Sequence, residues 1–272
     1  MQPLRTVFCV SDHTGMTAEA FAHSLIARFE PVDARYETRP FVDAEKIAAV
    51  VDEIDVVAGR GPRPIVFSTL SDPGLQDVLR HSQGLVIGLF DHFVDELSEE
   101  LGLSASRRPG QYHGIGDAAR YQLRLDAVDF ALMTDDGLGI DHYVRADVIL
   151  VGVSRVGKTP TCLSLAMHYG IRAANYPVAP EDHPDGELPV TLRTFRDRLY
   201  GLTIDPGRLH TIRMQRRPDS EYSDLAMCKR ELAHADRMFR SERLPIIDTT
   251  SRSIEEITAT IIESAELHRR VD

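Results

Sequence analysis

The first hundred residues alternate between short apolar runs and segments whose apolar residues recur at helical spacing. Runs 6–10, 64–70 and 85–90 are rich in β-branched and aromatic residues, which favours strands. Segments 18–29 and 43–58 place apolar residues three or four positions apart, as on one face of a helix. Run 85–90 is apolar throughout, which predicts a strand covered on both faces. This alternation predicts a parallel sheet with helices on both faces, that is, a doubly wound unit.

The second half resumes the alternation after a stretch without periodicity. Residues 104–117 are rich in Gly, Ser, Arg and Pro, which favours a linker. We therefore expect an α/β chain with a Rossmann-like domain at 1–104, a linker at 105–117 and a P-loop, nucleotide-kinase-like domain at 118–272. The other expected strands are 35–42, 148–151, 171–176, 198–204 and 244–247, and the other expected helices are 75–81, 91–101, 118–133, 163–169, 207–216, 223–240 and 253–268.

The apolar run 148–151 leads into a glycine loop of specific spacing. Gly152 is followed, after four residues, by Gly157, Lys158 and Thr159, which is the phosphate-binding pattern. Glycines let backbone N–H groups converge on phosphate oxygens, and the next helix adds its dipole. Lys158 would bring positive charge to the terminal phosphates, and Thr159 would offer a hydroxyl to Mg²⁺. The expected nucleotide-binding residues are Gly152, Val153, Ser154, Arg155, Val156, Gly157, Lys158 and Thr159.

Three acidic positions outside the loop are candidates for chemistry. Asp136, in an Asp-Asp-Gly turn, could accept a proton from a hydroxyl or hold a metal ion, and the alternative is a plain turn. Asp205 and Asp248 each follow an apolar strand, where the acid that holds Mg²⁺ together with Thr159 would lie. The alternative for each of these two is a helix N-cap.

A polar loop, Ser11-Asp-His-Thr-Gly15, follows the first expected strand. The carboxyl ends of parallel strands are where open sheets bind ligands, so this loop is a second candidate site. Capping of the next helix is the alternative interpretation.

Composition narrows the class of protein. The 272 residues carry a net charge of −11, which argues against nucleic-acid binding. Four arginines between 208 and 217 form the densest basic stretch, and most of them are expected on a solvated helix face. Three widely spaced cysteines fit neither a zinc site nor a disulfide framework and suit a reducing cytoplasm. No apolar run reaches membrane-spanning length, and no signal segment is evident, so we expect a cytoplasmic protein without a membrane partner.

Six motifs, in order along the chain, resemble the bacterial and plastid regulators of phosphoenolpyruvate synthase and of pyruvate, phosphate dikinase. The most specific is Gly152-Val-Ser-Arg-Val-Gly-Lys-Thr-Pro-Thr161. The likeness runs from about Val7 to Ile262. The other five motifs are Ser11-Asp-His-Thr-Gly-Met-Thr-Ala-Glu19, Thr134-Asp-Asp-Gly137, Gly170-Ile-Arg-Ala-Ala-Asn-Tyr-Pro177, Gly201-Leu-Thr-Ile-Asp-Pro206 and Ile247-Asp-Thr-Thr250.

The resemblance implies a bifunctional enzyme. It implies phosphoryl transfer from ADP to a threonine of the target enzyme, which inactivates the target, and removal of that phosphate by inorganic phosphate, which yields pyrophosphate. Lys158 and Asp136 match the family's loop lysine and acidic pair, which implies that they are catalytic and that Asp136 is the base that activates the threonine. His13 stands where the family pattern has Gly, so no role carries over to it. Overall similarity favours phosphoenolpyruvate synthase as the target, with pyruvate, phosphate dikinase as the alternative. The oligomeric state stays open, a homodimer being one option.

Two rival functions are compatible with the residues alone. A small-molecule kinase that uses ATP would need the same loop and the same α/β pattern. A module that binds ADP and docks on a partner, but catalyses no reaction, would need only the loop residues that bind the nucleotide. The phosphoryl donor and the presence of transfer would distinguish these functions.

Overall fold

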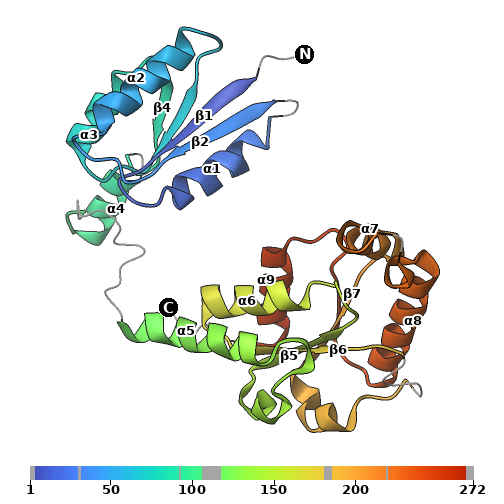
Figure 1. The fold of residues 1–272 in the computed structure, drawn as a ribbon. Coiled ribbons are helices and arrows are strands. Elements are labelled where there is room, and N and C mark those ends of the chain that lie inside the picture. The colour runs from blue at the N-terminus through green and yellow to red at the C-terminus, as the bar shows by residue number, and fades with distance from the viewer. Residues whose placement is uncertain are drawn as a thin grey trace. The chain divides into compact units, whose positions relative to one another are not determined.

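The computed structural model describes residues 4–29, 32–91, 93–105, 118–180, 186–218 and 220–267. The chain divides into two compact units, Met1–Gly114 and Ile115–Asp272. Each unit is an α/β layer structure with its own four-stranded parallel sheet (Figure 1). The linker predicted at 105–117 lies, apart from residue 105, outside the described residues, so its limits stay a prediction.

The N-terminal unit contains a sheet with the strand order β2-β1-β3-β4. Alternate residues of β1 face opposite layers. Val7 and Cys9 pack with α1, whereas Phe8 and Val10 pack with α2 and α3. Helices therefore cover both faces, as the doubly wound prediction required (Figure 1). The elements are β1 (Arg5–Val10), α1 (Met16–Ile26), β2 (Ala34–Arg39), α2 (Ile47–Ala58), β3 (Ile65–Ser68), α3 (Pro73–Arg80), β4 (Leu85–Gly88) and α4 (Val94–Leu101).

Strand β4 is shorter than the predicted strand 85–90 and lies at the edge of this sheet. It ends at Gly88, and among the described residues its ladder partner is β3. Val86 and Ile87 pack against the clusters on opposite faces of the sheet, so the strand is partly covered on both faces, as predicted. Leu85 remains 44% exposed, and the other strand residues are half-buried. The apolar run does not encode strand order, and the order places β4 at the sheet edge.

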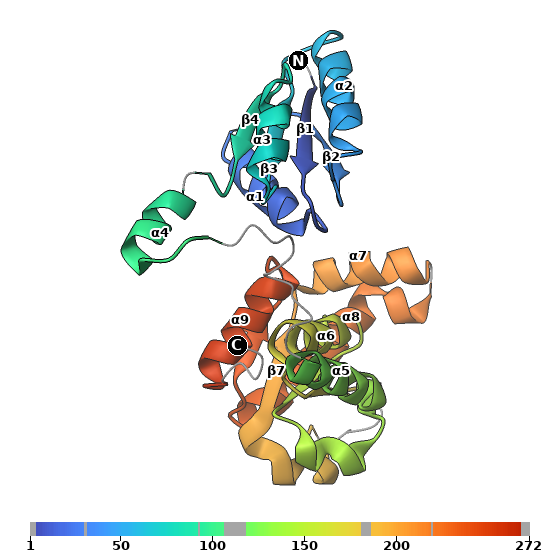
Figure 2. The same ribbon diagram turned by 90° about the vertical axis from the view of Figure 1, so that its left-hand side faces the viewer.

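The C-terminal unit contains a sheet with the order β6-β5-β7-β8. Helices α5 and α6 lie side by side (Figure 2), and α9 packs on α6. Helices α7 and α8 pack together on the opposite side of the sheet (Figure 1). All five residues of β5 are buried. The elements are α5 (Ala118–Met133), β5 (Val148–Gly152), α6 (Lys158–Tyr169), β6 (Ala173–Pro177), β7 (Leu199–Thr203), α7 (Pro206–Arg216), α8 (Leu225–Ser241), β8 (Ile246–Asp248) and α9 (Ile254–Ser264).

Short 3₁₀ helices join these elements. They are η2 (Asp135–Gly137), η3 (Ile140–Arg145), η4 (Val190–Arg198) and η5 (Glu221–Ser223). The sequence pattern predicts none of them, because a 3₁₀ segment is too short to show a periodic apolar stripe. At the start of the last helix, Ser253 and Glu256 form a capping box, in which each side chain accepts a hydrogen bond from the backbone N–H of the other residue.

The basic stretch 208–217 confirms the prediction that most of its arginines are solvated, and it contains one that is buried. Arg208, Arg216 and Arg217 are exposed, as predicted for a solvated face. Arg213 is fully buried, and its Nη2 lies 2.7 Å from Glu231 Oε2. Packing of α7 against α8 places this cation opposite a carboxylate, and such pairing is what allows a buried charge.

The three cysteines are free and buried. Burial raises the pKa of the Cys9 thiol to about 11 and that of Cys162 to about 12, so both are protonated at neutral pH. They behave as small buried apolar residues, and the free state agrees with the prediction that they form no disulfide framework. None of the helices in the described ranges combines the length and apolar character that crossing a bilayer demands.

Candidate functional site

The glycine loop connects β5 to α6 at the carboxyl edge of the second sheet. Gly157 is the N-cap of α6 with φ 102°, and Arg155 also has a positive φ of 74°. A Cβ at Gly157 would meet no atom within 4 Å, so the backbone there borders open space. At Gly152, a Cβ would approach Leu202 O to 2.8 Å, so the strand can pack on β7 only with glycine at this position. The loop presents backbone groups and one helix N-terminus to an incoming ligand.

Lys158 begins α6 and points back under the loop. Its side chain is 5% exposed, and Nζ donates a hydrogen bond to Val153 O at 3.1 Å. Asp136 Oδ1 lies 4.0 Å from the same Nζ. Burial lowers the pKa of Lys158 to about 8, while the charge of Asp136 acts in the opposite direction. The ammonium group is therefore desolvated and only partly neutralised, a state that favours a further anionic partner.

The acidic pair, Asp135 and Asp136, is hydrogen-bonded to Thr159 beside the loop and to Asn175 of β6. Asp135 Oδ1 accepts hydrogen bonds from Thr159 Oγ1 at 2.7 Å and from Asn175 Nδ2 at 2.6 Å. Asn175 Oδ1 accepts from the backbone N–H of Asp136 at 3.0 Å. Asp136 adopts φ 50° and ψ 43°, an uncommon conformation for a residue other than glycine. The turn is thus an ordered part of the site, joined to Thr159 and Lys158.

Sequence reasoning gave Asn175 no role. The side chain is fully buried in β6, yet its amide bonds to both members of the acidic pair. The available signal was a polar residue within the apolar strand run 171–176. A buried amide needs hydrogen-bond partners, so such a residue marks a polar junction inside the fold.

The two other acids lie at the carboxyl ends of β7 and β8. Asp205 is the N-cap of α7, and its Oδ1 accepts from Arg208 N–H at 2.9 Å. Asp248 Oδ1 accepts hydrogen bonds from Thr250 Oγ1 and from Thr250 N–H, the latter at 2.8 Å, and these two hydrogen bonds lower the pKa of Asp248. Asp205 thus has the N-cap role that was its alternative, and Asp248 supports the turn that follows β8. Within the described ranges, neither carboxylate is hydrogen-bonded to Thr159, and the metal assignment of both stays a prediction.

The oxygen atoms beside the loop can be compared with the ligands that Mg²⁺ usually takes in proteins. Among the described residues, no group of three or more His, Cys, Asp or Glu side chains is arranged to hold a metal. Mg²⁺ does not require such a cage, because it usually takes one or two protein oxygens together with phosphate and water oxygens. The hydrogen-bonded oxygens of Thr159 and Asp135 are hard donors of this kind. The residues present therefore fit Mg²⁺ at Thr159 and Asp135.

Beside the loop lies a small basic hollow, which we call the arginine pocket. It has a volume of about 250 Å³ and is lined by Ser154, Arg155, Arg216, Arg217 and Tyr222. Ser154 Oγ and Tyr222 Oη are hydrogen-bonded at 2.9 Å, which joins the loop to η5. Arg216 and Arg217 come from the C-terminal end of α7, so this pocket unites segments distant in sequence.

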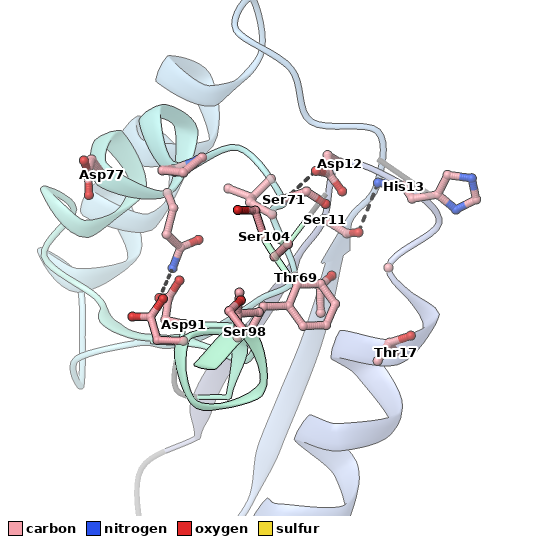
Figure 3. Close-up of a pocket in the computed structure, with 18 of the residues that line it drawn as sticks. Ser11, Asp12, His13, Thr17, Thr69, Ser71, Asp77, Asp91, Ser98 and Ser104 are labelled. Carbon is pink, nitrogen blue, oxygen red and sulfur yellow. Dashed lines mark hydrogen bonds between the residues drawn. The ribbon is translucent and has the colours of Figure 1, made fainter. Parts of the chain in front are cut away.

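The N-terminal unit has a separate and larger hollow of about 1100 Å³, at the carboxyl ends of β1 and β3 (Figure 3). Asp12 Oδ2 accepts from Ser71 N–H at 2.7 Å and joins the loops that follow these two strands. His13 points away from Ser71 and Asp91 in Figure 3. The charged groups in the lining comprise five carboxylates and one guanidinium, those of Asp12, Asp77, Asp91, Asp95, Glu99 and Arg80.

The loop 11–15 does not cap the first helix through a side chain. The N-cap of α1 is Gly15 at φ 79°, with no side-chain hydrogen bond to the helix. The loop therefore supplies the N-cap residue but no side-chain cap, and its polar side chains border the hollow.

Comparison with known proteins gives a consistent result over the whole chain. A family model described as kinase/pyrophosphorylase matches residues 7–262. A protein from Halorhodospira halophila with the name "Putative phosphoenolpyruvate synthase regulatory protein" is 48% identical over 274 residues, which is 100% of both chains. Proteins of the same name from Alkalilimnicola ehrlichii and Marinobacter nauticus are 48% and 44% identical, and each alignment covers 98% of the relative and 98% and 97% of this chain.

Proposed function

Because the chain belongs to the kinase/pyrophosphorylase family, we propose that it is a bifunctional regulator of phosphoenolpyruvate synthase. In one direction it transfers the β-phosphoryl group of ADP to a threonine of that enzyme and inactivates it. In the other direction it removes this phosphate with inorganic phosphate as the acceptor, which forms pyrophosphate. The names of the relatives support the choice of target.

The observation that carries the proposal is the meeting of Lys158 with Asp136 at 4.0 Å beside the glycine loop. Lys158 is buried, as suits a fixed charge for phosphate. The Asp136 side chain is 67% exposed, so a threonine on the surface of another protein can reach it. A group that takes a proton from a protein substrate must be within hydrogen-bond reach of that substrate, and Asp136 meets this condition.

In the kinase direction, a bond forms between the threonine Oγ and the β-phosphorus of ADP, while the bond from that phosphorus to the bridging oxygen of AMP breaks. The electron pair of the broken bond stays on AMP, and the threonine proton passes to Asp136. Lys158 and the backbone N–H groups of the loop stabilise the charge on the transferring group. Thr159 and Asp135 would hold Mg²⁺, which would supply further neutralisation of phosphate charge.

In the phosphorolysis direction, an oxygen of hydrogenphosphate attacks the phosphorus of phosphothreonine. The bond from this phosphorus to the threonine Oγ breaks, and the proton of hydrogenphosphate ends on that oxygen. The products are threonine and pyrophosphate. The acceptor is already an anion that carries its own proton, so this direction depends less on a protein base.

Transfer of label from ADP tests the proposed function. The full-length protein would be incubated with ADP labelled in the β-phosphate and with phosphoenolpyruvate synthase or pyruvate, phosphate dikinase, each phosphorylated beforehand on its catalytic histidine. Label on a threonine of phosphoenolpyruvate synthase is the expected result. Label on the dikinase alone would change the target. In a parallel incubation with ATP labelled in the γ-phosphate, label on a metabolite and none on either enzyme would favour a small-molecule kinase. Tight ADP binding without any transfer would contradict an enzyme and favour a sensing module.

The pKa of Lys158 gives the binding of ADP a specific dependence on pH. Burial lowers this pKa to about 8, so the ammonium is charged below that value and becomes neutral above it. We expect the affinity for ADP to fall as pH rises from about 7 to about 9.5, by up to about tenfold per pH unit above the pKa. In Lys158→Arg the guanidinium stays charged, and the fall should disappear. Calorimetric titration with ADP across this range measures both, and an unchanged fall in Lys158→Arg would assign the pH dependence to another group.

A further inference from the structure

We propose that the arginine pocket binds a second phosphate group, next to the one that the glycine loop holds. The inference deepens the proposed function and rests on it, because phosphorolysis requires two phosphate groups to meet at one site. It assigns Arg216 and Arg217, on α7, a direct role in ligand binding that the loop motif does not contain.

The charges in the pocket point to an anion. Arg155, Arg216 and Arg217 line one hollow of about 250 Å³, and all three side chains are exposed. In the described part of the chain, no carboxylate forms an ion pair with any of the three. Three guanidinium groups in one place, without a carboxylate partner among the described residues, are unexpected on a chain with a net charge of −11. Guanidinium groups match phosphate oxygens with two parallel hydrogen bonds, which favours phosphate over a simple monovalent anion.

The walls of the pocket are held in place by Arg213, which lies beneath them. Its guanidinium lies 4.3 Å from the centre of the Tyr222 ring, and Nη2 donates to Ser154 O at 3.1 Å. Glu231 fixes Arg213 from the other side through both carboxylate oxygens. The loop residue Ser154 and the ring of Tyr222 are therefore positioned before any ligand arrives, which lowers the entropic cost of binding.

The position of the pocket relates it to the reaction. Ser154 and Arg155 belong both to the pocket and to the glycine loop, so a phosphate in the pocket is a neighbour of a phosphate in the loop. Two phosphate dianions repel each other, and the single charge of Lys158 does not balance them. Arg155, Arg216 and Arg217 supply the additional positive charge that joining the two groups as pyrophosphate requires. The hollow of the N-terminal unit, with five carboxylates and one guanidinium, has the opposite character.

Pyrophosphate is a direct probe, since it would occupy the loop and the pocket together. The affinity for pyrophosphate is measured by calorimetric titration of the full chain. It should be about tenfold or more weaker in the double variant Arg216→Gln, Arg217→Gln, because charge-assisted hydrogen bonds to phosphate are lost. Arg237→Gln, an exposed arginine on α8 outside the pocket, is the matched control. Because the replaced side chains are exposed, the melting temperature should stay unchanged. Affinity of the folded double variant within twofold of the unaltered protein would overturn the proposal.

Kinetics of phosphorolysis then identify which phosphate the pocket holds. A raised KM for inorganic phosphate assigns the pocket to the attacking phosphate, whereas a raised KM for the phosphorylated target assigns it to the phosphothreonine. If neither KM changes, the pocket does not hold a reacting phosphate and the proposal fails. Absence of phosphoryl transfer in the unaltered protein would instead contradict the proposed function, and the pyrophosphate titration would still decide whether the pocket binds phosphate.

Discussion

Replacing Lys158 with methionine is expected to reduce phosphoryl transfer in both directions by on the order of a hundredfold to a thousandfold. Lys158 is 5% exposed and reaches the underside of the loop at Val153 O, so no other lysine can take its place there. Methionine fills a similar volume without the charge, which keeps the core packed. Initial rates of ADP-dependent phosphorylation and of pyrophosphate formation measure the loss.

The matched control for this variant is Lys229→Met, which removes an exposed lysine of α8. It should keep both activities. Removing the buried cation also relieves a desolvated charge, so the melting temperature of Lys158→Met should not fall, and a loss of activity will not reflect unfolding. Kinase activity of Lys158→Met equal to that of the unaltered protein would refute the assignment of the loop.

Replacing Asp136 with asparagine is expected to separate the two reactions. The kinase direction should lose a factor on the order of 10² to 10⁴, because a threonine hydroxyl needs a group that accepts its proton. Phosphorolysis should lose much less, since hydrogenphosphate is an anion and supplies its own proton. Asparagine keeps the shape, and the backbone N–H of Asp136 that bonds Asn175 is unaffected.

Asp141→Asn, an exposed acid in η3, serves as the control for a change of charge near the site. Both rates should be measured for each variant under saturating Mg²⁺, with ADP for one direction and inorganic phosphate for the other. An equal loss in both directions for Asp136→Asn would contradict the role of proton acceptor and favour a structural or metal-holding role.

Much of this molecule follows from local pattern. The strand, loop and helix around Gly152 to Thr159 are contiguous, and their spacing predicts their order. Helix α6 begins at Lys158, earlier than the apolar stripe 163–169 indicates. The helix limits agree within a few residues, and the family resemblance is confirmed by the match over residues 7–262. These features depend on residues within about one helical turn of each other or on a contiguous motif, so they can be predicted directly from the sequence.

Other features depend on which segments pair across the fold. Run 85–90 predicts a strand covered on both faces, but its composition does not show that β4 is an edge strand, in which Leu85 stays 44% exposed. Arg213 has the sequence context of a solvated arginine, and only the packing of α7 on α8 brings it to Glu231. Whether the residues of a segment are buried depends on which other elements of the chain pack against it, so the sequence of the segment alone does not determine their burial.

The sequence by itself determined the α/β class, the glycine loop, its lysine and the candidate acid Asp136. Only the tertiary structure decided that Asn175 of β6 orders the acidic pair, that Thr159 meets Asp135, and that Arg216 and Arg217 join Ser154 and Arg155 in one pocket. The physical reason is the separation in sequence of the residues that are in contact. A loop and its helix are specified by adjacent residues, whereas these contacts span up to about sixty residues and arise from parallel strand pairing, which places the ends of distant segments at one edge of the sheet.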